Sequence, residues 1–311
     1  MQALQWERLQ KQLKWVEEKS LFYQQKFAKA GVSVKDIKSL EDIQRLPFLT
    51  SNELFQVDSL DMLTMPLSGI MRFSVVQQEN GEVTKFYTNG DVARNVEMMS
   101  RCLVAAGVNQ TSVVALQGDM SDSRLMDVQY AAEMLGATVV TMGTDYRQWL
   151  RFMELISMDT IVSTPQLIMQ LIIQLQATGK NIADYPLNRI ICMNSQGLTN
   201  AMQRHIADRT HATVYNFYEP AELGMASMLF QCEAHKGYHI QEDYFYPEIV
   251  AFHSDCVVEE PHQMGELVVT TLSAEAVPLI RYRTGQAVML EKDVCDCGRT
   301  LHRVTTPFTF M

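Results

Sequence analysis

Cysteine and histidine side chains in the last third of the chain have the types and spacing of metal ligands. Cys295 and Cys297 flank one residue in a segment that predicts a tight turn, so both sulfurs can face one cation. Upstream, a short segment carries Cys232, His235 and His239. A structural zinc ion takes four Cys or His ligands, and two pairs from distant segments can build such a site. The spacing is not that of a standard zinc finger, so the pattern alone leaves both zinc and two free thiols with surface histidines open.

Other catalytic signatures are absent from the sequence. It contains no G-x-S-x-G, H-E-x-x-H or G-x-x-x-x-G-K-[ST] motif, which argues against a hydrolase, a zincin or a Walker-type NTPase. Cys102, Cys192 and Cys256 stand alone in the sequence. An isolated cysteine behaves as a small apolar residue, so we expect these three to be buried.

The middle of the chain predicts an α/β domain that would position such side chains. Short apolar, β-branched segments alternate with helical patterns between residues 91 and 216. This alternation indicates a mostly parallel sheet with helices on both faces. The predicted strands are 112–117, 137–142, 159–164, 188–193 and 212–217. One predicted helix begins at residue 91, and four others lie near 122–135, 146–157, 165–178 and 198–208.

The two ends of the chain have different patterns. Apolar residues at helical spacing predict one amphipathic helix over 1–30, which we expect to pack on its own domain. After residue 223 short strands follow without helices, at 247–253, 265–272 and 277–284, as in an antiparallel subdomain. We therefore divide the chain into an α/β region, 1–222, and a β-rich subdomain, 223–311.

Composition excludes several classes of function. The 311 residues are 47% hydrophobic and 20% charged, as in globular proteins. A net charge of −10 without a basic stripe argues against binding to nucleic acid. No apolar run is long enough to span a membrane, and the first residues lack the pattern of a secretory signal. We expect a cytoplasmic protein with reduced thiols rather than disulfides.

Segments spread over essentially the whole chain resemble one known family. They are GYHIQEDYFYPEIV (237–250), GELVVTTLSAEAVPLIRYRTGQ (265–286) and CDCGRT (295–300), together with 15–32, 36–50, 101–108 and 131–140. These segments closely resemble the phenylacetate-CoA ligase family, a branch of the AMP-forming adenylate ligases. The resemblance implies a large N-terminal α/β domain, a small C-terminal lid, and activation of an aryl or acyl acid with ATP and Mg²⁺ before transfer to CoA.

The resemblance also bears on the metal ligands. In relatives that bind zinc, the ligands match four residues here: Cys232, His239, Cys295 and Cys297. This implies a structural zinc ion and favours His239 over His235 as its ligand. Relatives are often homodimers, so the resemblance also implies a homodimer.

The family's phosphate loop is replaced in this chain. Relatives carry a Ser/Thr- and Gly-rich run ending in Lys-Pro, whereas residues 75–88 read VVQQENGEVTKFYT. A triphosphate needs inward-facing N–H groups, hydroxyls and a cation. The alternating pattern around Asn-Gly at 80–81 instead predicts a β-hairpin with a type I′ turn. Glu79 and Glu82 flank that turn, and a carboxylate about 4 Å from a phosphate charge costs about 4 kcal/mol. We expect this segment to repel ATP and Lys85 to be an ordinary solvated lysine.

The remaining nucleotide contacts are partly retained. By resemblance, Tyr218 matches a residue that stacks near adenine, and Glu222 matches one that holds Mg²⁺. Gln286 stands where relatives have an Asp that accepts ribose hydroxyls, and with Arg283 it marks the remnant of the nucleotide cleft. A Gln amide offers only one carbonyl oxygen as an acceptor. The adenine loop, 194–197, also departs from the family pattern.

These departures support three hypotheses. The chain ends shortly after CDCGRT, so we expect the C-terminal lid, which excludes water from such sites, to be absent. The first hypothesis is an adenylation-deficient binding or regulatory protein that recognises a small aromatic or acyl ligand. The second is an AMP-forming acyl-activating enzyme completed by a partner protein that supplies the lid. The third is an assembly subunit stabilised by zinc.

Overall fold

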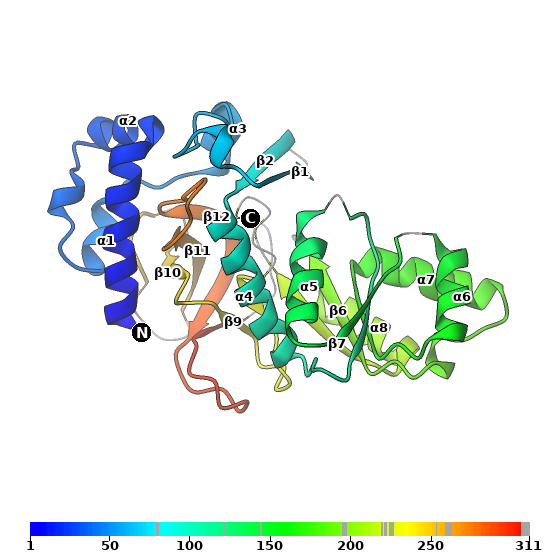
Figure 1. The fold of residues 1–311 in the computed structure, drawn as a ribbon. Helices are drawn as coiled ribbons and strands as arrows, with labels where there is room; N and C mark the ends of the chain where they lie inside the picture. Colours follow the sequence, from blue (N-terminus) through cyan, green and yellow to red (C-terminus); the bar gives the residue numbers. More distant parts are fainter. Residues whose placement is uncertain are drawn as a thin grey trace.

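Strands from both halves of the chain join in one hydrogen-bonded sheet (Figure 1). The computed structural model describes residues 1–78, 81–120, 122–143, 145–194, 198–218, 220, 223, 227–252, 254–258 and 263–305. Within these residues the sheet has eleven strands, in the order β10-β11-β12-β13-β9-β8-β7-β6-β5-β3-β4. Its strands lie on both sides of residue 222 in the sequence, and the division at that residue stays a prediction.

One half of the sheet is parallel and confirms the predicted α/β class. Neighbouring strands in the order β4-β3-β5-β6-β7 are all parallel. These strands are β3 (Val113–Leu116), β4 (Thr138–Thr141), β5 (Thr160–Ser163), β6 (Arg189–Asn194) and β7 (Thr213–Tyr218). The helices along this half are α4 (Asn89–Ala105), α5 (Ser123–Met134), α6 (Tyr146–Leu155), α7 (Pro165–Ala177) and α8 (Asn200–Thr210).

Helices cover both faces of this parallel half. Apolar residues of α4 and α5 form one buried cluster with side chains of β3, β5, β6 and β7. Residues of α6, α7 and α8 form a second cluster with alternate side chains of the same strands. Because successive side chains of a strand point to opposite faces, nearly continuous apolar strands fill both clusters. The carboxyl ends of these strands are thereby held at one edge.

The other half of the sheet is antiparallel. Its strands are β8 (Leu229–Phe230), β9 (Tyr238–Ile240), β10 (Phe245–Val250), β11 (Met264–Thr271), β12 (Tyr282–Glu291) and β13 (Arg303–Thr305). The strands predicted at 247–253 and 265–272 are present with shifted ends. The strand predicted over 277–284 was wrong in position, because regular pairing begins only at Tyr282. Arg281, just before it, has a left-handed φ of 49°, which interrupts the extended backbone at this non-glycine residue.

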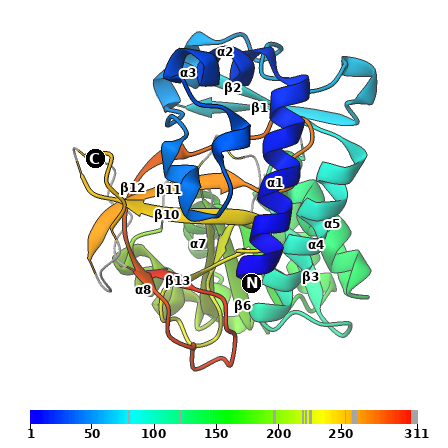
Figure 2. The ribbon, with the colours of Figure 1, turned by 90° about the vertical axis from the view of Figure 1, so that its left-hand side faces the viewer.

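The N-terminal segment lies against β10–β12 (Figure 2). Two helices stand in place of the single helix predicted over 1–30: α1 (Gln2–Lys19) and α2 (Leu21–Ala30). Ser20 adopts an extended conformation and its hydroxyl accepts a hydrogen bond from the Tyr23 N–H, so it ends one helix and caps the next. The short helices are α3 (Ser51–Gln56), η1 (Val34–Asp36), η2 (Glu41–Arg45), η3 (Leu67–Gly69) and η4 (Ile182–Asp184).

A separate two-stranded hairpin stands beside the main sheet (Figure 1). It consists of β1 (Arg72–Gln78) and β2 (Gly81–Tyr87), as predicted. None of the described helices has the length and apolar character of a membrane span.

Candidate functional site

Four side chains from distant parts of the sequence meet in a cluster with the composition of a metal centre. They are Cys232, His239, Cys295 and Cys297, and their ligand atoms all lie within 4.8 Å of one another. The Cys232 and Cys295 sulfurs are 3.8 Å apart, and the Cys297 sulfur lies 3.4 Å from His239 Nε2. In a tetrahedral zinc site two sulfurs lie about 3.8 Å apart, and a sulfur and a nitrogen about 3.6 Å apart. The cluster therefore fits the coordination that zinc prefers.

The antiparallel strands bring these ligands together. Cys232 follows β8 and His239 lies in β9, which pairs with both β8 and β13. Cys295 and Cys297 lie in the turn between β12 and β13, where the Gly298 N–H donates to the Cys295 carbonyl at 2.8 Å. Gly298 has a φ of +81°, which glycine adopts without strain. The predicted tight turn is therefore present.

Hydrogen bonding orients the histidine for a metal. His239 is fully buried, and its Nδ1 lies 3.2 Å from the Leu301 carbonyl. A proton on Nδ1 donated to that carbonyl leaves Nε2, the atom that faces Cys297, free to bind a cation. Burial lowers the pKa of His239 and so favours the neutral, metal-binding form. His235, the alternative ligand, stacks on Tyr215 with ring centroids 5.0 Å apart and is not part of the cluster.

The thiols of the cluster differ in acidity. Burial raises the pKa of Cys232 to about 12. Burial also acts to raise the pKa of Cys297, but hydrogen bonds with Arg299, Cys295 and Cys232 together outweigh it and the net shift is downward. A thiolate at Cys297 is therefore the easiest to form, and a bound cation would supply the charge that the buried Cys232 lacks.

The three isolated cysteines lie elsewhere. Cys102 and Cys192 are fully buried, as predicted, and burial raises the pKa of the Cys192 thiol to about 12. The prediction for Cys256 was wrong, because this thiol is exposed. It lies in the turn after β10, where its N–H bonds to the Ser254 hydroxyl.

Residues predicted to remain from a nucleotide cleft are largely enclosed by the protein itself. Tyr218 at the end of β7 has no exposed surface and belongs to an apolar cluster with Met228 and Leu229. Gln286 on β12 is 1% exposed, and its Oε1 has no hydrogen-bond partner among the described residues. A base cannot stack on a tyrosine ring that has no exposed face. Glu222 and 195–197 lie outside the described residues.

The arginines of the RYRTGQ segment are held by carboxylates. Arg283 donates from Nε to Glu266 at 2.7 Å and lies 5.1 Å from the centre of the Phe48 ring. Arg281 is 2% exposed and makes a bidentate pair with Glu248 at 2.9 and 3.0 Å. Its Nη1 also donates to the backbone carbonyls of residues 44 and 46. Arg281 is therefore a structural residue, a role that the sequence did not reveal because Glu248 and these carbonyls come from other segments.

The hairpin pairs along its whole described length. Arg72 pairs with Tyr87, and Gln78 pairs with Gly81 at the far end. Only two residues, 79 and 80, connect the strands, and they lie outside the described residues. Gly81 thus belongs to β2 and not to the turn, which corrects the predicted Asn-Gly turn by one residue.

Buried polar contacts fix the hairpin to α5 and α4. Arg72 donates to Asp127 at 2.6 Å, and Asn95 donates to the other oxygen of that carboxylate at 3.2 Å. The Ser123 hydroxyl lies 3.1 Å from that of Ser74. No pattern in the sequence predicts this network, because its members come from three separate elements.

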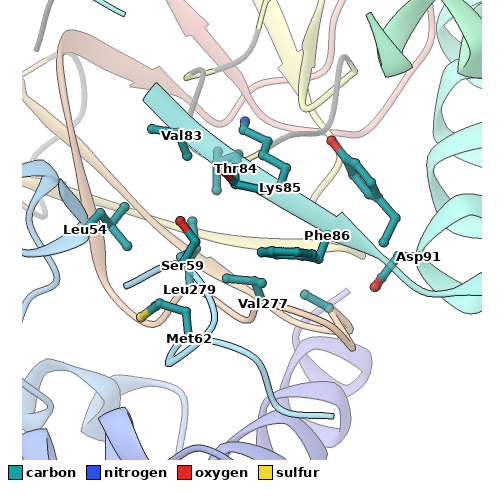
Figure 3. A pocket seen from close by; sticks show the side chains of 13 residues that line it. Leu54, Ser59, Met62, Val83, Thr84, Lys85, Phe86, Asp91, Val277 and Leu279 are labelled. Carbon is teal, nitrogen blue, oxygen red and sulfur yellow. The ribbon is translucent and has the colours of Figure 1, made fainter. Parts of the chain in front are cut away.

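A small cavity lies between the hairpin and the segments around α3 and residue 277 (Figure 3). Phe86 faces Val277 and Leu279 across it, whereas the Lys85 amino group points away from Met62. The cavity holds about 60 Å³, less than half the volume of about 150 Å³ of a cavity known to bind benzene. Lys85 is only 6% exposed, so its prediction as a solvated lysine was wrong.

Comparison with known proteins defines first the class and then the family. The structure resembles that of 2-hydroxyisobutyryl-CoA ligase in an open conformation with 2-HIB-AMP and CoA. The TM-score is 0.86 at 20% identity, over 96% of this chain and 71% of that one. The fold is thus that of the AMP-forming CoA ligases. No family model matches the chain.

Sequence comparison identifies the family. The chain is 30% identical over 309 residues to phenylacetate-coenzyme A ligase of Escherichia coli (strain K12), covering 98% of this chain and 70% of the relative. It is 29% identical to the enzyme of the same name from Thermus thermophilus, over 96% of this chain and 68% of that relative. The chain belongs to the phenylacetate-CoA ligase family.

Proposed function

We propose that this chain is a member of the phenylacetate-CoA ligase family that does not form acyl-adenylates and acts as a binding protein. The observation that carries the proposal is the register of the hairpin, in which Gln78 pairs with Gly81. The regular pairing of β1 with β2 up to Gln78 and Gly81 leaves no room within the described strands for a loop like that of a phosphate site. Glu82, next to that pair, adds a negative charge that opposes phosphate binding.

The enclosure of the remaining nucleotide residues supports the same proposal. Tyr218 and Gln286 are buried, and Arg283 is paired with Glu266. Nucleotide binding would have to separate Arg283 from its carboxylate and uncover the tyrosine ring. Separating Arg283 from Glu266 opposes binding, because a paired charge is costly to separate.

We also propose that the four-residue cluster holds a structural zinc ion. The ligand set, the distances between ligand atoms and the orientation of His239 support this assignment. A closed tetrahedral site of four Cys and His ligands leaves no position for a substrate. The zinc would therefore stabilise the β8–β9 and β12–β13 segments without taking part in chemistry.

ATP–pyrophosphate exchange tests the proposal. The chain is incubated with ATP, Mg²⁺, labelled pyrophosphate and a panel of aryl and acyl acids, with the E. coli phenylacetate-CoA ligase as the positive control. We expect no exchange above the acid-free blank. Acid-dependent exchange by this chain alone would contradict the proposal.

A second candidate function is an acyl-activating enzyme that a lid-bearing partner completes. The presence of Tyr218 and Glu222, at positions matching family nucleotide and Mg²⁺ contacts, favours it. Its test is CoA-thioester formation in mixtures of this chain with a separately expressed C-terminal lid of the E. coli relative. A thioester that forms in the mixture, but with neither component alone, would support this second candidate over the first.

A further inference from the structure

The four residues of the metal cluster differ in their access to solvent. Cys232, His239 and Cys295 are at most 3% exposed, whereas Cys297 is only partly buried. A closed tetrahedral zinc site has no open position on the metal. A small reactive molecule from solvent would therefore meet the Cys297 sulfur before any other ligand atom of the cluster.

The Cys297 sulfur also has other thiols within reach. It makes side-chain hydrogen bonds with both Cys295 and Cys232, and all ligand atoms of the cluster lie within 4.8 Å of one another. A disulfide joins two sulfurs at about 2.05 Å, so the Cys297 and Cys232 sulfurs need to approach each other by less than about 3 Å.

Cys232 suits a bridge to Cys297 better than Cys295 does. Cys295 is two residues from Cys297, and a bridge between them would close a small, strained ring within the turn that the Gly298 N–H fixes. Cys232 follows β8 and lies on a separate segment. The Cys232 and Cys295 sulfurs are 3.8 Å apart, but both side chains are buried, so a molecule from solvent reaches neither of them first.

We propose that Cys297 is a modification site for hydroperoxides, and that its oxidation forms a Cys232–Cys297 disulfide and releases the zinc ion. The release of zinc rests on the proposed function of the cluster as a zinc site. The disulfide rests only on the exposure of Cys297 and on its distance from Cys232.

The oxidation takes place in two steps. In the first, the Cys297 thiolate attacks one peroxide oxygen, the O–O bond breaks, hydroxide leaves, and the sulfur becomes a sulfenic acid. In the second, the Cys232 thiolate attacks the Cys297 sulfur, the S–O bond breaks, a second hydroxide leaves, and the S–S bond forms. Both hydroxides take a proton from solvent. Two electrons pass from the two sulfurs to the peroxide.

The disulfide changes the ligand set and can be reversed. Its two sulfurs are no longer thiolates, and only Cys295 and His239 remain, fewer than the four ligands of a structural zinc site. The bridge still joins the segment after β8 to the turn before β13. A dithiol restores both thiols by exchange and is itself oxidised to a disulfide.

Titration of the zinc-loaded Cys256→Ser protein with hydrogen peroxide tests the proposal. This variant removes an exposed thiol outside the cluster and keeps five of the six cysteines. We expect the free thiols to fall from five to three per chain while one zinc per chain appears in solution. Peptide mass spectrometry should find residue 232 linked to residue 297. A dithiol followed by zinc should restore all five thiols and the bound ion.

The double variant Cys256→Ser/Cys297→Ser is the matched control. Its four remaining cysteines, Cys102, Cys192, Cys232 and Cys295, are all buried. Because Cys297 is a proposed zinc ligand, the control is compared with the single variant after zinc has been removed from both. We expect the single variant to lose two thiols and the control to keep its four at the same peroxide concentration.

Three results would overturn the inference. They are retention of all five thiols in the zinc-loaded single variant, a linkage between any other pair of cysteines, and equal thiol loss in a folded control. The linkage decides even if the control fails to fold, because only the named pair supports the proposal. Purified protein without zinc would contradict the zinc assignment alone, and the zinc-free comparison would still test the disulfide.

Discussion

The metal cluster and the remnant nucleotide residues make opposite use of their polar groups. In the cluster, three sulfurs and a ring nitrogen converge within 4.8 Å. The Arg299 guanidinium lies beside Cys297, and a bound cation would complete the four-ligand set. In the nucleotide region, Arg283 pairs with Glu266, and Tyr218 is packed in an apolar cluster. The first region is arranged for a ligand from outside, whereas Arg283 and Tyr218 of the second are held by the protein's own groups.

The two regions also differ in how closely each is tied to the main sheet. The metal cluster lies between strands of the main sheet, so residues that keep the cluster together also stabilise the fold. The segment that matches the family's phosphate loop by resemblance is a hairpin outside that sheet, so its loop can change without changing the strand order. The match to the family extends over 98% of this chain, and the proposed loss of phosphate binding concerns a segment outside that sheet.

Removing a cluster ligand should have the largest effect. Cys295→Ser is expected to lose the zinc and several kcal/mol of stability, since structural zinc contributes roughly 10–16 kcal/mol in zinc-finger peptides. Elemental analysis and thermal unfolding measure the two effects. The control is Cys256→Ser, which changes an exposed thiol outside the cluster and should keep one zinc per chain. Full zinc content in Cys295→Ser would contradict the assignment of this cluster as the zinc site.

The buried pair of the RYRTGQ segment should have the next largest effect. Glu248→Gln leaves Arg281 charged and unpaired at 2% exposure, which should cost about 3–5 kcal/mol in urea unfolding. Glu7→Gln breaks an exposed pair with Lys11 and should change stability by less than about 1 kcal/mol. Equal effects of the two variants would contradict the structural role of Arg281.

The carboxylate that holds the hairpin should give a smaller, pH-dependent effect. Burial raises the pKa of Asp127 from its usual 3.8 to about 6, although Arg72 acts to lower it. The folded protein therefore binds the proton more tightly than the unfolded chain, and this group's contribution to stability falls as pH rises from about 4 to about 6. The fall is about 3 kcal/mol at most.

Asp127→Asn isolates this effect because its side chain does not titrate. From pH 4 to pH 6 the original chain should lose unfolding free energy relative to Asp127→Asn. Above about pH 7 the difference between the two proteins should stay constant. A difference that does not vary with pH would show that Asp127 keeps its usual pKa.

The sequence predicted the regular elements better than their connections. Apolar periodicity located every strand of the parallel half, because β3, β5, β6 and β7 are buried on both faces and the edge strand β4 is apolar at its centre. It missed the break at Ser20, since the helical pattern continues through that residue. It also misplaced β12, because the conformation of Arg281 depends on Glu248, which lies in another strand.

The metal ligands could be proposed from residue types and resemblance. The groups that orient those ligands could not. The Leu301 carbonyl that orients His239 is a backbone group, and no side-chain pattern marks it. The burial of Lys85 and of Gln286 likewise depends on how the hairpin and β12 pack. Such properties arise from tertiary contacts, which spacing along the chain does not encode.

Calorimetric titration of the zinc-loaded chain with ATP and Mg²⁺ tests the central claim most directly, with the E. coli relative measured in parallel. The hairpin register predicts no saturable heat for this chain under conditions in which the relative binds. Binding of one ATP per chain at micromolar concentrations would contradict the proposal that this chain has lost its nucleotide site.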